Sequence, residues 1–312
     1  MMNIRQEIEA AAARLRPYVR RTPVLPLSAG ESGGEFTVFL KLEYLQHVGS
    51  FKPRGAFNRM LSAEIPPAGV IAASGGNHGL AVAYAAGVLG VPAEIFVPEI
   101  AAPVKIARLK ELSATVHVVG RHYAEAWNAC AARQAVSKAL LVHAYDQPEV
   151  LAGQGTVGAE FEEQCQGLDT VIVAVGGGGL VGGIAGWFAG RARVVAVEPR
   201  TSCALHAALA AGSPVDVDVS GIAADSLGAR RVGEHMFPVA QQHVDRVVLV
   251  DDAQIRAAQQ ALWRDFRIVA EPGGATAFAA LRSRLYVPQR GERVGVVVCG
   301  ANCDPATITG TP

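Results

Sequence analysis

The sequence predicts a parallel α/β fold, and three observations support this prediction. Short apolar runs of strand length alternate with longer alanine-rich segments of helix length along most of the 312 residues. Half of the residues are apolar and only 18% are charged, which is typical of a chain that buries a large core. Two strand-to-helix junctions, at residues 74–79 and 176–179, are rich in glycine. Junctions of this kind are common ligand sites in α/β proteins.

The individual elements follow in order. Residues 1–21 carry charged side chains at helical spacing and predict an N-terminal helix. Pro23 and Pro26 make residues 21–27 an extended arm, because each proline disfavours helix in the residue before it. A β-rich run, 36–42, comes next. Beyond it we expect strands at 69–73, 93–97, 115–119, 170–175, 193–197, 244–250 and 294–299, and helices at 77–89, 103–112, 123–136, 180–189, 252–266 and 273–285.

The chain contains no repeat of solenoid period and no low-complexity linker, so any division into lobes must be re-entrant. We expect a smaller, mobile lobe of residues 56–145, inserted into a larger lobe made of residues 1–55 and 146–312. Only 13 residues follow the last expected strand, and we therefore expect no C-terminal regulatory domain.

Composition argues against several classes of protein. Basic and acidic residues number 28 each, and no basic stripe is visible, so nucleic-acid binding is not expected. The five cysteines are odd in number and contain no CxxC pair, which argues against a disulfide framework and favours reduced thiols in a cytoplasmic protein. The uncharged runs 71–93 and 170–190 contain too many glycines for a continuous helix, so no membrane segment is expected.

Lys52 lies next to Phe51 at the start of a helix-like segment that begins with Pro53. A lysine that forms an imine has to lose its proton near neutral pH, which an apolar wall or a neighbouring positive charge promotes. Phe51 and Arg54 are the candidates for these two roles. The stretch by itself also permits Lys52 and Arg54 to be ordinary solvated charges.

The first glycine loop is Ser74-Gly75-Gly76-Asn77-His78-Gly79. It joins a strand to a helix, where unpaired amides and the helix dipole favour an anion. Asn77 either caps this helix or reaches a ligand hydroxyl. His78 either acts as a base or packs in a structural role, and the structural role is favoured.

The second glycine loop consists of Gly176, Gly177, Gly178 and Gly179, followed by Leu180. Four consecutive glycines cost backbone entropy, so they indicate a ligand that approaches the main chain closely. Neither glycine loop contains lysine or arginine, and a bound phosphate or carboxylate would therefore be held by backbone amides.

An alternative interpretation uses the same loop. Gly177, Gly179 and Gly182 satisfy the GxGxxG pattern, and Glu198 stands where a ribose-binding acid would be. This pattern predicts a nicotinamide-dependent oxidoreductase. However, at least three β/α units precede the motif, and the interpretation gives Lys52 no role.

Six motifs occur together between residues 21 and 304, namely 50–56 (SFKPRGA), 74–79 (SGGNHG), 152–156 (AGQGT), 176–180 (GGGGL), 271–275 (EPGGA) and 299–302 (CGAN). In these motifs and their order, the chain resembles the threonine/serine dehydratase branch of the fold type II pyridoxal-phosphate enzymes. The resemblance implies a two-lobed fold of mostly parallel sheets flanked by helices. It also implies pyridoxal 5'-phosphate as cofactor, an amino acid as substrate and a homodimer.

The resemblance assigns roles to individual residues. It implies that Lys52 holds the cofactor as a Schiff base, with Phe51 beside the pyridine ring. Asn77 would bond the ring hydroxyl, and Glu271 would lie near the ring nitrogen. Cys299 would face that nitrogen, where the family usually has serine. The remaining residues would bind the phosphate (Gly176, Gly177, Gly178, Gly179 and Leu180) or the substrate carboxylate (Ser74, Gly75, Gly76, Asn77 and His78).

The reaction implied is an α,β-elimination. Lys52, once displaced from the cofactor, would take the Cα proton, while the cofactor accepts the electron pair. A neutral thiol at the ring nitrogen does not stabilise a long-lived carbanion, so loss of the β-substituent is favoured. L-threonine or L-serine would give an enamine that hydrolyses to a 2-oxo acid and ammonia.

Besides Cys299, the sequence departs from the family at three places. Gly75 stands where serine racemases of the family carry a serine that acts as a base, so racemisation is expected to be weak or absent. Ala204 replaces an expected aspartate of a divalent-cation site and leaves Glu198 alone, so no required metal is expected. Residues 225–227 (DSL) differ from the usual Asp-Gly pair. The loops 144–148 and 221–227 would touch the β-substituent, and racemisation and β-replacement remain alternative outcomes.

Overall fold

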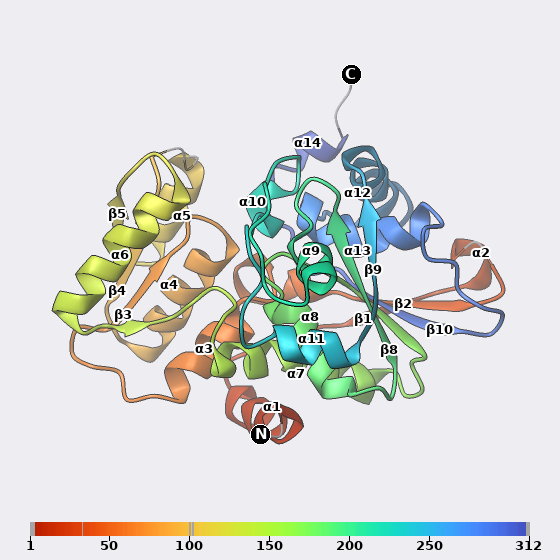
Figure 1. Ribbon diagram of the computed structural model, residues 1–312, viewed down its shortest axis with the longest axis horizontal. Helices are drawn as coiled ribbons and strands as arrows, with labels where there is room; N and C mark the ends of the chain where they lie inside the picture. Colours follow the sequence, from red (N-terminus) through yellow and green to blue (C-terminus); the bar gives the residue numbers. More distant parts are fainter. Residues whose placement is uncertain (1–3, 33, 100, 102, 310–312) are drawn as a thin grey trace.

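The computed structural model describes residues 4–32, 34–99, 101 and 103–309. These residues form two β-sheets that lie side by side, each flanked by helices (Figure 1). The predicted α/β class with mostly parallel sheets is confirmed.

The larger sheet has the strand order β1-β2-β10-β7-β8-β9. β1 is antiparallel to β2, and the other neighbours are parallel. Every residue of the central strand β7 is buried, because helices cover both faces of a parallel sheet. The strands are β1 (Val24–Leu27), β2 (Thr37–Lys41), β7 (Thr170–Ala174), β8 (Arg193–Pro199), β9 (Val244–Val250) and β10 (Arg293–Val297).

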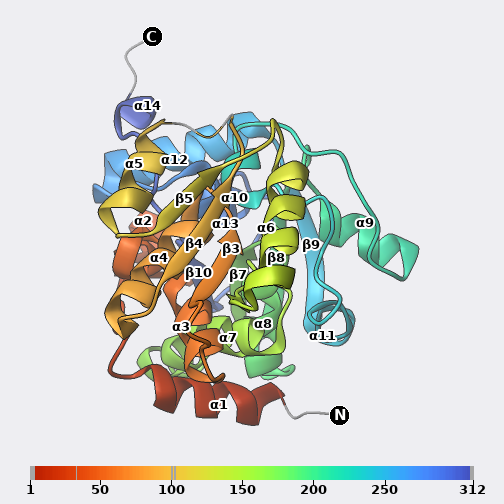
Figure 2. The same ribbon diagram turned by 90° about the vertical axis from the view of Figure 1, so that its left-hand side faces the viewer.

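The smaller sheet has the order β5-β4-β3-β6, and all its neighbours are parallel. Its strands are β3 (Val70–Ala73), β4 (Ala93–Val97), β5 (Thr115–Val118) and β6 (Leu140–Leu141). The helices α4 (Asn77–Leu89), α5 (Pro103–Glu111) and α6 (Tyr123–Ser137) connect these strands (Figure 2).

The other helices belong to the larger sheet or link the two sheets. They are α1 (Ile4–Leu15), α2 (Ala29–Ser32), α3 (Pro53–Leu61), α7 (Pro148–Gln164), α8 (Gly179–Phe188), α9 (Ala204–Ala211), α10 (Ala224–Leu227), α11 (Phe237–His243), α12 (Asp252–Phe266), α13 (Pro272–Arg282) and α14 (Ala306–Thr309). Two 3₁₀ turns, η1 (Glu43–Leu45) and η2 (His47–Gly49), precede α3. Within the described part of the chain, no helix is both long and apolar enough to cross a membrane.

The seven predicted strands and six predicted helices are all present, with ends that differ from prediction by one to three residues where they differ at all. The expected N-terminal helix corresponds to α1, and the expected arm and β-rich run contain β1 and β2. Among the described residues, three buried clusters of apolar side chains lie around the sheets, one at the larger sheet and two at the smaller sheet. The lobe boundaries at 55/56 and 145/146 stay a prediction.

The helix α7 is the main element that the sequence did not predict. Gly153, Gly155 and Gly158 lower its intrinsic helix propensity. The structure gives a reason for two of these glycines. A Cβ on Gly153 would lie 2.5 Å from the carbonyl oxygen of Arg54, and one on Gly155 would lie 2.9 Å from that of Gly183. The glycines therefore let α7 pack closely against α3 and α8, and this packing places the start of α3.

Candidate active site

A cleft opens at the carboxyl ends of the strands of the larger sheet, where parallel α/β proteins commonly bind ligands. Its walls come from the starts of α3, α4, α8 and α13, from α10, and from the loops that follow β6, β7 and β10. The lining residues are Phe51, Lys52, Asn77, Tyr145, Ala174, Gly176, Gly177, Gly178, Gly179, Leu180, Ser226, Leu227, Glu271, Gly273 and Cys299.

All of the residues predicted to contact the cofactor line this cleft. Four predicted carboxylate-binding residues, Ser74, Gly75, Gly76 and His78, do not line it. The Ser74 hydroxyl instead accepts a hydrogen bond from the amide of Gly76, within the loop that leads into α4. Tyr145, Ser226 and Leu227 belong to the two loops that the sequence indicated only as ranges.

Lys52 is partly buried at the start of α3, and its Nζ donates a hydrogen bond to the carbonyl oxygen of Ala144 at 2.7 Å. The same Nζ lies 5.1 Å from the centre of the Phe51 ring. Burial lowers the pKa of Lys52 to about 8, although electrostatic interactions with Cys299 and Glu271 oppose this shift. The amine therefore loses its proton far more easily than a solvated lysine does.

The predicted electrostatic role of Arg54 is wrong. Its guanidinium is 1% exposed and donates to both carboxylate oxygens of Glu43 at 2.8 Å and to Glu160 at 3.1 Å. These carboxylates balance its charge, and the lowered pKa of Lys52 comes from burial instead. The interpretation of Arg54 as a solvated charge is wrong for the same reason.

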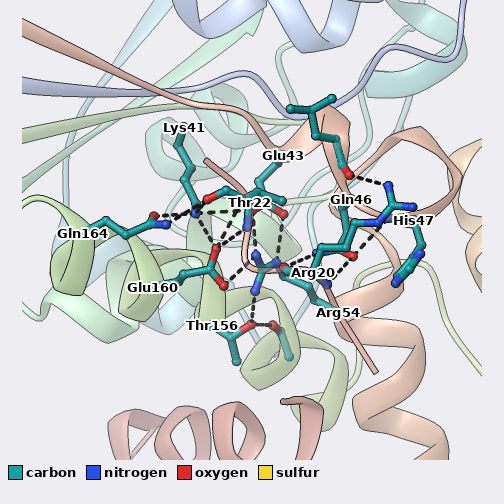
Figure 3. Close-up of polar contacts among 12 residues, drawn as sticks. Arg20, Thr22, Lys41, Glu43, Gln46, His47, Arg54, Thr156, Glu160 and Gln164 are labelled. Atoms are coloured by element: carbon teal, nitrogen blue, oxygen red, sulfur yellow. Dashed lines mark hydrogen bonds and ion pairs between the residues drawn. The ribbon is translucent and has the colours of Figure 1, made fainter. Parts of the chain in front are cut away.

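Arg54 belongs to a buried network of two cations and two carboxylates (Figure 3). Lys41, at the end of β2, pairs with Glu160 of α7 and lies 4.0 Å from Glu43. Buried charges are tolerated when each is paired and hydrogen-bonded. The network joins β2, η1, α3 and α7, and it therefore holds the segment that carries Lys52. Charged residues in the otherwise apolar stretch 38–45 were the sequence signal for it.

Asn77 is the first residue of α4, but its side chain does not cap the helix. Its Nδ2 donates to Glu271 Oε1 at 2.5 Å, and its Oδ1 accepts from Asn302 Nδ2 at 2.6 Å. The capping interpretation of Asn77 is therefore wrong. Its amide faces the cleft as part of a hydrogen-bonded chain that the sequence did not predict.

Glu271 and Cys299 have shifted acidities. Burial raises the pKa of Glu271 to about 7, and the hydrogen bond from Asn77 opposes the shift. Burial also raises the pKa of Cys299 to about 12, so its thiol is neutral at physiological pH and donates to the carbonyl oxygen of Gly273. Glu271 and Lys52 thus both titrate near neutral pH, which is typical of sites that move protons.

His78 is buried, and its Nε2 lies 2.8 Å from the carbonyl oxygen of Val142. Burial, together with the positive charge of Lys52, lowers the pKa of His78 to about 3. The neutral ring bonds a backbone group beside β6, which is the kind of structural role that the sequence favours.

The second glycine loop needs glycine for steric reasons. Gly178 has a φ of +89°, and a Cβ on Gly177 would lie 2.3 Å from the Tyr145 ring. The loop leads directly into α8, so backbone amides and the positive end of the helix dipole face the cleft without any cationic side chain from the loop. This donor set fits a phosphate group.

Glu198 is not available to a ribose. It is buried at the end of β8, and its two carboxylate oxygens accept hydrogen bonds of 2.8 Å from the amides of Leu205 and His206 at the start of α9. This geometry argues against the nicotinamide interpretation. Among the described residues, no three His, Cys, Asp or Glu side chains gather as a metal site, and the metal-independent reaction stays a prediction.

Comparison with known proteins matches residues 15–300 to the pyridoxal-phosphate dependent enzyme family. The chain is 37% identical over 307 residues to an L-threonine ammonia-lyase of Geobacter sulfurreducens, an alignment that covers 97% of this chain and 76% of the relative. It is 36% identical over 306 residues to a phenylserine dehydratase of Ralstonia pickettii, covering 96% and 94% respectively. The structure of maize serine racemase is similar with a TM-score of 0.92 and 32% identity, covering 98% of this chain and 95% of that one.

The family match covers most of the chain, and the fold, the glycine loop and the partly buried lysine agree with it. The resemblance stated from the sequence motifs is confirmed, and with it the cofactor. The chain belongs to the pyridoxal-phosphate-dependent enzymes of fold type II.

Proposed function

We propose that this protein is a lyase that eliminates water from a β-hydroxy amino acid, such as L-threonine or L-serine, and releases a 2-oxo acid and ammonia. The observation that carries the proposal is the convergence of Lys52, Asn77, Glu271, the glycine loop and the neutral thiol of Cys299 on one cleft. The relatives named for ammonia-lyase and dehydratase reactions support it.

Pyridoxal 5'-phosphate, when bound, supplies an electron sink for the pair that remains when the Cα–H bond breaks. Lys52 would hold the cofactor and, once freed as an amine, would accept the Cα proton. The backbone amides of Gly176–Gly179 would bind the phosphate, and the Asn77 side chain would bond the ring hydroxyl. The backbone amides of the loop from Ser74 to His78 would bind and orient the substrate carboxylate. Because most residues of this loop do not line the cleft, this role requires the loop to move when the substrate binds.

The charges of the cleft favour a neutral β-substituent. Among its lining residues, Lys52 alone has a basic side chain, and that amine serves the reaction itself. Tyr145, Ser226 and Leu227 offer an aromatic ring, a hydroxyl and an aliphatic surface. A second carboxylate on the substrate would have no cationic partner among these side chains.

A panel of β-hydroxy amino acids tests the proposal. Holoenzyme is incubated with L-threonine, L-serine, L-threo-phenylserine and L-threo-3-hydroxyaspartate, and release of 2-oxo acid and ammonia is measured. We expect turnover with at least one neutral substrate and little with hydroxyaspartate. A holoenzyme that releases no 2-oxo acid from any of them is not this lyase.

Racemisation is the second candidate, because the maize racemase has a similar structure. Gly75 has no side chain to act as a base, but among the described residues the atoms nearest to a Cβ there would be those of Ala101 at 3.4 Å and Val97 at 3.5 Å, which are ordinary contacts. We therefore expect weak or no formation of D-serine by the wild type and a rate at least about tenfold higher with Gly75→Ser. Chiral chromatography of unreacted serine measures this gain, and Gly75→Ala is the control without a hydroxyl.

D-serine from the wild type at a rate comparable to elimination would favour a racemase, and consumption of serine without ammonia release would favour β-replacement.

The pH dependence of cofactor attachment tests the acidity of Lys52. Only the neutral amine attacks an aldehyde, so the rate of imine formation rises as pH increases through the pKa of the lysine. We expect a midpoint near pH 8 for the apoprotein, because burial lowers the pKa of Lys52 to about 8. Nα-acetyl-lysine, with an ordinary pKa of about 10.4, is the reference. A midpoint equal to that of the reference would contradict the burial effect.

A further inference from the structure

A directional chain of hydrogen bonds runs from the helix α5 into the cleft. Arg108 Nη1 donates to Asn302 Oδ1 at 2.9 Å. Asn302 Nδ2 donates to Asn77 Oδ1 at 2.6 Å, and Asn77 Nδ2 donates to Glu271 Oε1 at 2.5 Å. Each side chain donates to the next, from a cation at one end to a carboxylate at the other. The hydrogen bonds within such a chain polarise and so strengthen one another in a medium of low dielectric constant.

The donors and acceptors at the start of the chain determine its direction. A guanidinium only donates hydrogen bonds, so the Asn302 atom that faces Arg108 must be the carbonyl oxygen. The Asn302 nitrogen then faces the carbonyl oxygen of Val48, at 2.8 Å, and Asn77. Asn77 is left with its own nitrogen toward Glu271. Two groups fix this order of donors and acceptors, namely the guanidinium of Arg108 and the carbonyl oxygen of Val48, and of the two the guanidinium carries charge.

Two glycines make room for the chain. Gly49 has a φ of +78°, and a Cβ on it would lie 2.7 Å from Asn302 Oδ1. A Cβ on Gly300 would lie 2.1 Å from Glu271 Oε1 and 3.4 Å from Asn77 Nδ2. Any side chain at either position would push into the hydrogen-bonded groups. The backbone at Gly49 and at Gly300 therefore leaves the space that these hydrogen bonds occupy.

Arg108 does not line the cleft, and it acts from the smaller sheet on a loop that follows β10 of the larger sheet. Lys105, one helical turn earlier on α5, makes a separate ion pair with Asp225 of α10. The helix α5 therefore contacts the larger sheet's segments through two neighbouring cations. Of these two cations, Arg108 is the one that is joined to Glu271 through hydrogen bonds.

We propose that Arg108 is a positioning residue for the cleft, which acts through Asn302 to hold the Asn77 amide nitrogen toward Glu271 and so stabilises the Glu271 carboxylate. The consequence for turnover rests on the lyase function proposed above, in which Asn77 and Glu271 face the cofactor. The expected effect on the acidity of Glu271 does not depend on that function. The charged and titratable groups that act on Glu271 or respond to it are Lys52, Lys105, Asp225, Cys299 and Cys303.

Side-chain NMR tests the proposal without a cofactor. The sequence has only five asparagines, Asn3, Asn58, Asn77, Asn128 and Asn302, so ¹⁵N-asparagine labelling of the full chain gives few side-chain amide signals. The variants Asn77→Asp and Asn302→Ala each remove one side-chain amide signal and so assign the signals of Asn77 and Asn302. The Asn77 signal should titrate with a midpoint near pH 7, since burial raises the pKa of its acceptor Glu271 to about 7. Arg108→Met should move this midpoint upward by about one pH unit, because the carboxylate loses support from its donor chain.

Lys105→Met is the matched control, since it removes a neighbouring cation of the same helix but leaves the chain intact. We expect a smaller shift from it than from Arg108→Met, and partial recovery with Arg108→Lys. In the Asn302→Ala background, Arg108→Met should add nothing further. Equal shifts from the two methionine variants, no shift from Arg108→Met, or additive shifts with Asn302→Ala would overturn the proposal. The expected titration in a protein without lyase activity would retain the role of Arg108 and reject the lyase.

Discussion

Lys52→Ala is expected to lower kcat for 2-oxo acid release by at least about 10³-fold while the protein remains folded. The variant loses both the amine that holds the cofactor and the base that takes the Cα proton. The lost contacts in the fold are few, because among the described residues the Nζ donates one hydrogen bond, to Ala144. Steady-state kinetics and circular dichroism measure the two effects separately.

Three controls separate chemistry from folding in this experiment. Lys110→Ala removes an exposed lysine of α5 and should leave kcat unchanged. Added methylamine should restore part of the activity of Lys52→Ala, because it supplies an amine to an otherwise intact cleft. Borohydride reduction of wild-type holoenzyme followed by peptide mapping should find the cofactor on Lys52. Cofactor on any other lysine would refute the assignment.

Arg54→Met is expected to lower the free energy of unfolding by about 3–5 kcal/mol, because it leaves buried carboxylates without their cation. Glu43 is fully buried, and Arg54 provides two of its hydrogen bonds. Burial raises the pKa of Glu43, but the charge of Arg54 and that of Lys41 more than offset it, and the pKa is lowered overall. Urea denaturation at neutral pH measures the loss.

The sign of the pH dependence should reverse in this variant. In the wild type, the stability contributed by Glu43 is present above its unfolded pKa and is lost as pH falls through the lower folded value. Without Arg54, burial raises the folded pKa, and protonation of Glu43 should relieve part of the loss as pH is lowered. Arg59→Met is the control, because Arg59 pairs with Glu149 near the surface and such pairs contribute about 1 kcal/mol or less. An Arg54→Met variant as stable as Arg59→Met would show that the buried network contributes little.

The sequence by itself determined the fold class and the place of the cleft. Buried parallel strands such as β3 and β7 are continuous apolar runs, and a glycine-rich junction follows each of them, so both patterns are local and readable. The motifs around Lys52, Asn77 and the second glycine loop also indicated the family, because each of them is a short contiguous segment.

Only the tertiary structure decided how these residues are held and charged. The helix α7 forms in spite of Gly153, Gly155 and Gly158 because the first two of these glycines let it pack closely against α3 and α8, a benefit that local propensity does not contain. Arg54 and Glu160 are more than 100 positions apart, yet they form one ion pair. The acidities of Lys52 and Glu271 depend on burial by such distant segments. Local sequence identifies these ionisable groups, but their protonation near neutral pH depends on the distances and burial that folding creates.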